Sequence, residues 1–277
     1  MKILLYIIVP CIILAALYIA SICTYISKRR RRKFADTTLI CPYAHRGLHG
    51  EGVPENSLAA FKKAVENGHG IELDLQLSAD GEVMVFHDYT LKRMTGEAGL
   101  LSDRTAEELR AMKLAGTDEH IPTLREVLEL VDGQVPLLVE LKGENASTAL
   151  PPRANEILRE YKGDYCIESF NPLLVAWYKK NRPDVMRGQL YTNVCREKKI
   201  TPLNILLTLL AFNFIARPDF VAFDHKYASI LPLRIAHALC KPHRFTWTVR
   251  TEDGFDVARK YSANPIFEGE LPSDFKK

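Results

Sequence analysis

The sequence predicts an α/β protein whose main domain is a (β/α)8 barrel, and three observations lead to this prediction. Short apolar runs of strand length recur along the chain after residue 34, with amphipathic segments of helical length between most of them. Alternating strands and helices are typical of a largely parallel sheet, because each parallel crossover needs a long connection. Eight strands remain after one hairpin arm is set aside, which is the strand number of this barrel.

Nine stretches are expected as strands. The third cannot belong to the barrel, because the turn Ser78–Gly81 joins it to the second too tightly for a parallel crossover. We expect it to be an antiparallel arm within a small hairpin and helical insertion after strand two. The expected strands are Ile40–Ala44, Gly70–Leu75, Val83–Phe86, Pro136–Leu141, Tyr165–Ser169, Val185–Leu190, Phe220–Phe223, Phe245–Val249 and Pro265–Glu268.

The first part of the chain is expected to be a membrane anchor. Residues 3–26 are almost unbroken Ile, Leu, Val, Ala and Tyr, long enough to cross a bilayer and too long for the core of a signal peptide. Six basic residues follow at 28–33, so the positive-inside rule places the rest of the chain in the cytosol. The expected domains are a transmembrane helix with its basic flank at 1–33 and a barrel at 34–277 in a single-pass membrane protein.

Charge and cysteine content narrow the class of protein. The formal net charge is +3, but residues 1–33 hold seven basic and no acidic residues, which leaves residues 34–277 at −4. That domain lacks the basic surface that nucleic acid requires, so no nucleic-acid partner is expected. The six cysteines form no CxxC pair, so neither a disulfide framework nor a zinc site is indicated.

Acidic side chains gather on the strands that would build the active-site face of such a barrel. Glu72 and Asp74 are two residues apart on the second strand, so they project from the same side of it. Glu140 stands on a later strand, with Lys142 two residues beyond. Three carboxylates that converge in a barrel mouth are hard oxygen ligands, which predicts a Mg²⁺ or Ca²⁺ site at Glu72, Asp74 and Glu140.

Two histidines and two cations complete the candidate site. His45 and Arg46 follow the first strand, and His87 closes the hairpin arm, where its ring would be aimed over the same mouth. Displacement at phosphorus needs a base for the attacking oxygen, an acid for the leaving oxygen and positive charge for the anionic oxygens. Together with Lys142 these residues offer every such group, which indicates phosphoryl transfer.

In order and content, these residues resemble the glycerophosphodiester phosphodiesterase family, a family of metal-dependent barrel enzymes. The resemblance runs from about residue 43 to 272 through the stretches AHRG, PENS, ELDLQLSADGEVMVFHD, IPTLREVLELV, LVELK, ESFNP and WTV. The roles that it implies are a catalytic pair at His45 and His87, metal ligands at Glu72, Asp74 and Glu140, and substrate or network residues at Arg46, Glu55 and Lys142.

The last quarter of the chain departs from the family pattern in two places. Arg250 follows the Trp-Thr-Val run, where the family usually has Asn. Residues 267–272 replace a run that usually contains Asp, and this chain has Glu268 there. Trp247 has two interpretations that stay open, a core residue or an aromatic contact for a polyol or choline group of the substrate.

A second apolar stretch, residues 201–216, follows the sixth barrel strand candidate and therefore leaves the barrel on the active-site side. It is too short for a membrane span, and basic residues flank it at 196, 198, 199 and 217. Two interpretations stay open, a helix that contacts membrane lipid and an ordinary buried barrel helix. The first would bring lipid to the barrel mouth and favour a lysophospholipid substrate.

The leading functional hypothesis is a metal-dependent phosphodiesterase that hydrolyses a glycerophosphodiester or a lysophospholipid to an alcohol and a phosphomonoester. An enzymatic alternative is phospholipase-D-like transfer or cyclisation, in which a hydroxyl of the substrate attacks phosphorus. A third possibility is a barrel that binds lipid headgroups without catalysis. The complete set of histidines and carboxylates argues against this third possibility, whereas it serves attack by water and by a hydroxyl equally.

Overall fold

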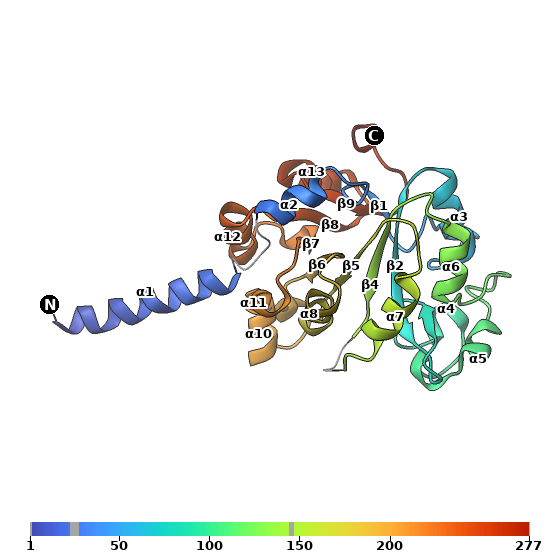
Figure 1. The fold of residues 1–277 in the computed structure, drawn as a ribbon, viewed down its shortest axis with the longest axis horizontal. Coiled ribbons are helices and arrows are strands. Elements are labelled where there is room, and N and C mark those ends of the chain that lie inside the picture. The colour runs from blue at the N-terminus through green and yellow to red at the C-terminus, as the bar shows by residue number, and fades with distance from the viewer. Residues whose placement is uncertain (1, 23–27, 144–146, 277) are drawn as a thin grey trace.

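A closed ring of parallel strands forms the body of the computed structural model, which describes residues 2–22, 28–143 and 147–276. The first strand pairs in parallel with both the second and the last, and this double pairing closes the sheet (Figure 1). Within the described ranges the barrel has eight strands, as predicted. They are β1 Tyr43–Ala44, β2 Gly70–Leu77, β4 Leu137–Leu141, β5 Tyr165–Ser169, β6 Met186–Tyr191, β7 Phe220–Asp224, β8 His243–Val249 and β9 Asn264–Phe267.

The remaining strand, β3 Val83–Val85, pairs antiparallel with the end of β2. This confirms the predicted hairpin arm, and short helical segments follow it before the chain returns to β4. The helices are α1 Lys2–Ile22, α2 Lys28–Ala35, α3 Leu58–Glu66, α4 Lys92–Thr95, α5 Ala106–Arg110, α6 Leu124–Val131, α7 Leu150–Leu158, α8 Pro172–Asn181, α9 Val194–Glu197, α10 Pro202–Thr208, α11 Asn213–Ala216, α12 Leu231–Leu239 and α13 Glu252–Tyr261.

Several helices begin at capping residues that the sequence places just before them. Ser57 accepts a hydrogen bond from the amide of Ala60 at the start of α3. Thr123 and Glu126 cap α6 reciprocally through side chain and backbone. Asn171 precedes Pro172 and caps α8. These caps set the residues at which the three helices begin.

Strand alternation divides the core into a lumen and an outer layer. Leu138 and Cys166 belong to a cluster of buried residues that come from the same face of strands around the whole barrel. This face therefore points into the lumen. The neighbouring residues Val139 and Ile167 lie in the cluster that packs against the surrounding helices. At the amino-terminal end of the barrel, the buried Phe34 belongs to the lumen cluster, so hydrophobic packing closes that end.

The predicted membrane span over residues 3–26 is not supported. Within the residues described, no helix is both long and apolar enough to cross a membrane. Helix α1 ends at Ile22, and residues 23–26 of the predicted span lie outside the described residues. The last turns of α1 contact protein, because Ile22 is buried beside Leu210 and the hydroxyl of Tyr18 donates to the Leu209 carbonyl. The single-pass topology and the cytosolic orientation rested on this span and are likewise unsupported.

Residues 201–216 form neither of the single helices that the sequence suggested. They fold into the short helices α10 and α11 joined by a turn. Leu210 and Asn213 are buried, whereas Leu203, Leu206 and Phe214 are exposed. The segment therefore has one side against the barrel and one side facing outward, and Figure 1 places it between α1 and α8.

Candidate active site

The lumen-facing positions of the strands deliver the acidic side chains. On β2, Ile71 and Leu73 pack outward in the helix-facing cluster, so Glu72 and Asp74 project inward. The same alternation turns Glu140 inward on β4. The register between β2 and β4 pairs Asp74 with Glu140, which brings the two strands' carboxylates to the same level of the barrel.

The three carboxylates form a compact buried group. One oxygen each from Glu72, Asp74 and Glu140 lies within 4.8 Å of the others. The Lys142 ammonium lies 3.0 Å from Asp74 Oδ1 and 3.0 Å from Glu140 Oε1. These oxygen ligands fit a divalent cation such as Mg²⁺ or Ca²⁺, since both prefer carboxylates. These are the three residues that the sequence predicted as metal ligands.

The pKa values of these carboxyl groups are shifted because they lie buried and close to one another and to positive charges. Burial, together with the charges of Asp74 and Glu140, raises the pKa of Glu72 well above its ordinary value. Burial also raises the pKa of Glu140 to about 7, although Lys142 opposes the shift. Burial would raise the pKa of Asp74 as well, but the positive charges of Lys142 and Arg46 outweigh it, so that pKa is lowered. A bound cation would relieve the repulsion that the single ammonium leaves in place.

Arg46 and Asn56 attach the loop that follows β1 to the buried carboxylates. The Arg46 amide donates to Glu72 Oε2 over 2.8 Å, and its guanidinium contacts Glu55 Oε1 at 2.7 Å. The Asn56 amide nitrogen donates to Asp74 Oδ2 over 2.8 Å. Both Arg46 and Asn56 have positive φ angles, 55° and 54°, a conformation that costs energy outside glycine. Their contacts with buried carboxylates hold them in it.

His45 lies beside a carboxylate from the opposite end of the sequence. Its Nδ1 is 2.7 Å from Glu268 Oε1, just beyond the end of β9. The Arg250 guanidinium donates to both oxygens of Glu268 at 2.6 and 2.7 Å. His45, His49 and Glu268 also bring ligand atoms within 4.8 Å of one another, but Arg250 already occupies this carboxylate and makes it a poorer cation site. Burial lowers the pKa of His45 to about 4, and the hydrogen bond that the ring donates to Glu268 opposes this shift.

His87 is held over the mouth by the strand below it. The side-chain amide of Gln76 donates to the carbonyls of Phe86 and Asp88 at 2.8 Å each, which clamps the loop that carries His87. His87 Nδ1 lies 2.7 Å from Asp88 Oδ1. Burial lowers the pKa of His87, whereas the charge of Asp74 opposes the change. Arg93 links this loop to the loop after β1, because it contacts both Asp88 and Glu55.

These residues border one small pocket at the carboxyl ends of the strands, and it contains most of the predicted site. Trp247 donates from its indole nitrogen to the Ala222 carbonyl over 2.9 Å and meets Phe170 edge to face at 5.5 Å. The tryptophan is thus anchored by protein on one side and faces the pocket on another. The predicted residues that line the pocket are His45, Arg46, Glu72, His87, Glu140, Lys142 and Trp247. Asp74 and Glu55 lie just behind, in contact with Arg46.

Sequence reasoning missed several residues that hold or border this pocket. Glu168 on β5 is buried and lines it, and burial raises its pKa well above the ordinary value. Its signal was a carboxylate inside a buried strand, of the same kind that singled out Glu140. Glu268 and Arg250 stood out as departures from a family pattern, yet no local signal paired them. Gln76 continues the inward alternation of Glu72 and Asp74, which could have identified it.

The fold and the site define a barrel protein with an acidic, histidine-containing pocket suited to phosphoryl chemistry, and the comparisons with known proteins agree. Residues 45–268 match the pattern of the Glycerophosphoryl diester phosphodiesterase family. Because that match covers most of the chain, the protein belongs to this family.

Individual relatives are consistent with that assignment. A glycerophosphodiester phosphodiesterase of Caldanaerobacter subterraneus is 39% identical over 163 residues, which cover 53% of this chain and 65% of the relative. A lysophospholipase D of Rattus norvegicus is 29% identical over 79% of this chain and 70% of its own length. The crystal structure of a glycerophosphodiester phosphodiesterase from Thermotoga maritima superposes with a TM-score of 0.64 at 27% identity, covering 83% of this chain and 94% of that one.

Proposed function

We propose that the protein is a metal-dependent phosphodiesterase that hydrolyses glycerophosphodiesters or lysophospholipids to an alcohol and a phosphomonoester. The observation that carries the proposal is the convergence of two histidines, three buried carboxylates and two cationic side chains on one pocket. Family membership supports the reaction class. The relative named as a lysophospholipase D supports a lysophospholipid as one substrate class.

His45 is the proposed base toward the attacking water. A carboxylate can only accept hydrogen bonds, so the ring proton of neutral His45 lies on Nδ1, which faces Glu268. This leaves Nε2 free to accept a proton from water. Its low pKa keeps the ring neutral near pH 7, the form that a base needs.

His87 is the proposed acid toward the leaving alcohol. As the water oxygen forms its bond to phosphorus, the bond from phosphorus to the alcohol oxygen breaks and His87 gives that oxygen a proton. Burial disfavours the protonated ring, but Asp74 and the hydrogen bond with Asp88 favour it. A bound phosphodiester anion would favour it further. His45 ends with the proton from water and His87 without its own, so the charges balance.

The remaining site residues are proposed to bind rather than to transfer protons. A Mg²⁺ or Ca²⁺ ion held by Glu72, Asp74 and Glu140 would supply positive charge that polarises the phosphate oxygens. The remaining anionic oxygens would be faced by Lys142 and by Arg46, which Glu55 holds in place. Trp247 would offer its ring to the polyol or choline end of the substrate.

Phosphorus NMR of the reaction products tests the proposal directly. The full-length protein is incubated with glycerophosphocholine and with lysophosphatidylcholine in the presence of Mg²⁺ or Ca²⁺. A phosphomonoester signal is the expected result. A cyclic phosphodiester would identify attack by the neighbouring hydroxyl of the substrate. Absence of turnover on both compounds, with binding retained, would identify a headgroup-binding barrel and overturn the proposal.

We also propose that the outward side of residues 201–216 contacts membrane lipid. Leu206 and Phe214 are exposed there, beside the pocket residue Leu207 and between the basic stretches that flank the segment. Replacement of Leu206 and Phe214 with Ser should reduce sedimentation of the full-length protein with anionic liposomes. Leu231→Ser with Leu239→Ser is the matched control, because these exposed leucines lie on α12. Equal losses for both pairs would contradict a specific contact.

A further inference from the structure

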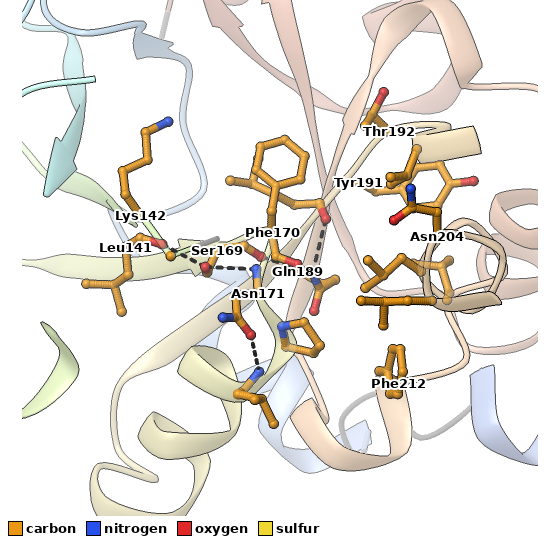
Figure 2. A pocket seen from close by; sticks show the side chains of 18 of the residues that line it. Leu141, Lys142, Ser169, Phe170, Asn171, Gln189, Tyr191, Thr192, Asn204 and Phe212 are labelled. Carbon is orange, nitrogen blue, oxygen red and sulfur yellow. Dashed lines mark hydrogen bonds between the residues drawn. The ribbon is translucent and has the colours of Figure 1, made fainter. Parts of the chain in front are cut away.

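A second, much larger pocket lies against the catalytic one. It has a volume of about 660 Å³, within the usual range of about 300–1,000 Å³ for ligand sites. Its walls come from the ends of β4, β5 and β6, the start of α8, and the helices α10 and α11. Figure 2 shows Lys142 at one end of this row of side chains and Asn204 and Phe212 at the other.

The two pockets adjoin one another. Glu140, Lys142, Phe170 and Leu190 line both of them. A single molecule could therefore place a phosphodiester among the catalytic groups and extend from there into the larger pocket. The shared boundary carries charge on Glu140 and Lys142 and apolar surface on Phe170 and Leu190, so it suits the junction between a polar and an apolar part of one ligand.

The larger pocket is mainly apolar away from this junction, although Thr192, Lys198 and Asn204 also line it. Its far wall consists of side chains from α10, α11 and the turn between them, together with the first turn of α8. The apolar residues of this wall are Leu173, Leu203, Leu207, Leu210, Phe212 and Ile215. Such a lining favours a hydrocarbon ligand, since each buried CH₂ group adds about fourfold to affinity at most.

Several polar side chains of the pocket are already used by the protein itself. The hydroxyl of Ser169 donates to the Leu141 carbonyl, and the Asn171 side chain accepts from the Leu173 amide (Figure 2). The amide nitrogen of Gln189 donates to the Phe170 carbonyl. These groups shape the walls around the ends of β5 and β6. Among the described residues, Gln189 Oε1 and Thr192 Oγ1 also line the pocket without a hydrogen-bond partner, so a ligand meets two polar atoms beside the apolar side chains.

We propose that this pocket binds the single acyl chain of a lysophospholipid whose phosphodiester lies at the catalytic site. The proposal rests on the proposed phosphodiesterase function and specifies which substrate class it prefers. Residues 201–216 then have two sides with separate tasks. Leu207 and Phe212 contact the chain, whereas Leu206 and Phe214, which do not line the pocket, face outward. The pocket thus selects lysophospholipids over glycerophosphodiesters without an acyl chain.

A chain-length series on the full-length protein tests the inference. The substrates are lysophosphatidylcholines with 6, 8, 10 and 12 acyl carbons, each kept below its micelle-forming concentration, and glycerophosphocholine is the reference without a chain. We expect kcat/KM, divided by that of glycerophosphocholine, to rise with each added pair of carbons by up to about 15-fold. Leu207→Gln should flatten the rise. Leu206→Gln, one residue away on the same helix, should retain it.

The outcomes distinguish failure of the acyl-pocket proposal from failure of the proposed phosphodiesterase function. Turnover of glycerophosphocholine with no dependence on chain length would overturn the acyl pocket and leave the phosphodiesterase intact. The same slope in Leu207→Gln and Leu206→Gln would also overturn the pocket. If no phosphodiester is turned over, calorimetric binding of lysophosphatidic acids with 8 to 12 carbons decides. Tighter binding of longer chains that Leu207→Gln weakens would support the pocket, and binding independent of length would refute it.

The variant Leu203→Trp, which should obstruct the pocket, provides a second test if Leu207→Gln does not fold. Leu203 lines the pocket and is also solvent-exposed, so a larger side chain can be accommodated without disturbing the core. This variant should shorten the preferred chain. Ile205→Trp is its control, because Ile205 is exposed on the same helix and does not line the pocket. Identical chain preference in the two Trp variants would contradict the proposal, and thermal unfolding monitors the fold of each.

Discussion

His45 and Glu268 face each other across 2.7 Å, although 223 residues separate them in the sequence. Glu268 also receives two hydrogen bonds from Arg250, so it lies between a histidine and an arginine. Burial would raise the pKa of Glu268, but the hydrogen bonds from His45 and Arg250 outweigh it and lower the pKa. Glu268 is therefore an anion that fixes both the orientation and the tautomer of His45.

Glu268→Gln should lower kcat by at least about tenfold, because an amide can donate to Nδ1 and move the ring proton to the catalytic nitrogen. Glu268 raises the pKa of His45 in the parent, so its loss should move the acidic limb of the kcat/KM profile to lower pH. Glu270→Gln, on an exposed neighbour, is the control. An unshifted pH profile in Glu268→Gln would reduce this residue to a structural role.

Removal of divalent ions should abolish activity, since three buried carboxylates repel one another without a cation. EDTA is expected to bring the parent to background, and added Mg²⁺ or Ca²⁺ to restore it. Glu72→Gln should remain inactive at the same ion concentrations, whereas Glu66→Gln, an exposed residue of α3, should behave as the parent. Full activity in EDTA would disprove the metal assignment.

Loss of either histidine should lower activity at least about 10²-fold, within the range of general acid and base groups. The two variants should differ with a substrate whose leaving group is a nitrophenol, which needs no protonation. Such a substrate should partly rescue His87→Ala and leave His45→Ala inactive. Rescue of His45→Ala instead would exchange the two roles, and full activity of both variants would remove them.

His237, which lies outside the candidate active site, should make the stability of the fold depend on pH. Burial beside Phe223 and Tyr261 lowers its pKa to about 4, and Arg244 adds to the shift. Neither ring nitrogen has a hydrogen-bond partner among the described residues. The unfolded chain binds a proton at this histidine below its ordinary pKa of about 6.5, whereas the folded chain does so only near 4. Its contribution to stability is thus lost as the pH falls from about 6.5 to 4.

His237→Phe keeps an aromatic ring between Phe223 and Tyr261 but cannot bind a proton. Relative to the parent, the variant should become more stable by about 1–2 kcal/mol between pH 7 and pH 4.5, a value reduced for the partial exposure of the ring. Urea unfolding at a series of pH values measures the difference. A constant difference between parent and variant across this range would show that the ring is not protonated on unfolding.

Much of the barrel could be predicted because its signals are local. The apolar runs, the turn before Val83 and the spacing of Glu72 and Asp74 need only neighbouring residues to be interpreted. The N-terminal prediction used the same kind of signal and was not supported, since apolar composition alone does not distinguish lipid from protein contact. The buried Ile22 and the hydrogen bond from Tyr18 show that the end of α1 contacts the barrel.

Sequence alone is enough to infer the strand pattern, the carboxylates and histidines of the candidate site, and their side of each strand, because alternation and residue chemistry are properties of short segments. Which distant groups meet depends on how the whole chain folds. Closure of the ring brings β9 beside β1 and so Glu268 to His45. The folding of residues 201–216 against the ends of β5 and β6 creates the apolar pocket. Both depend on packing between segments far apart in the chain, which no local pattern records.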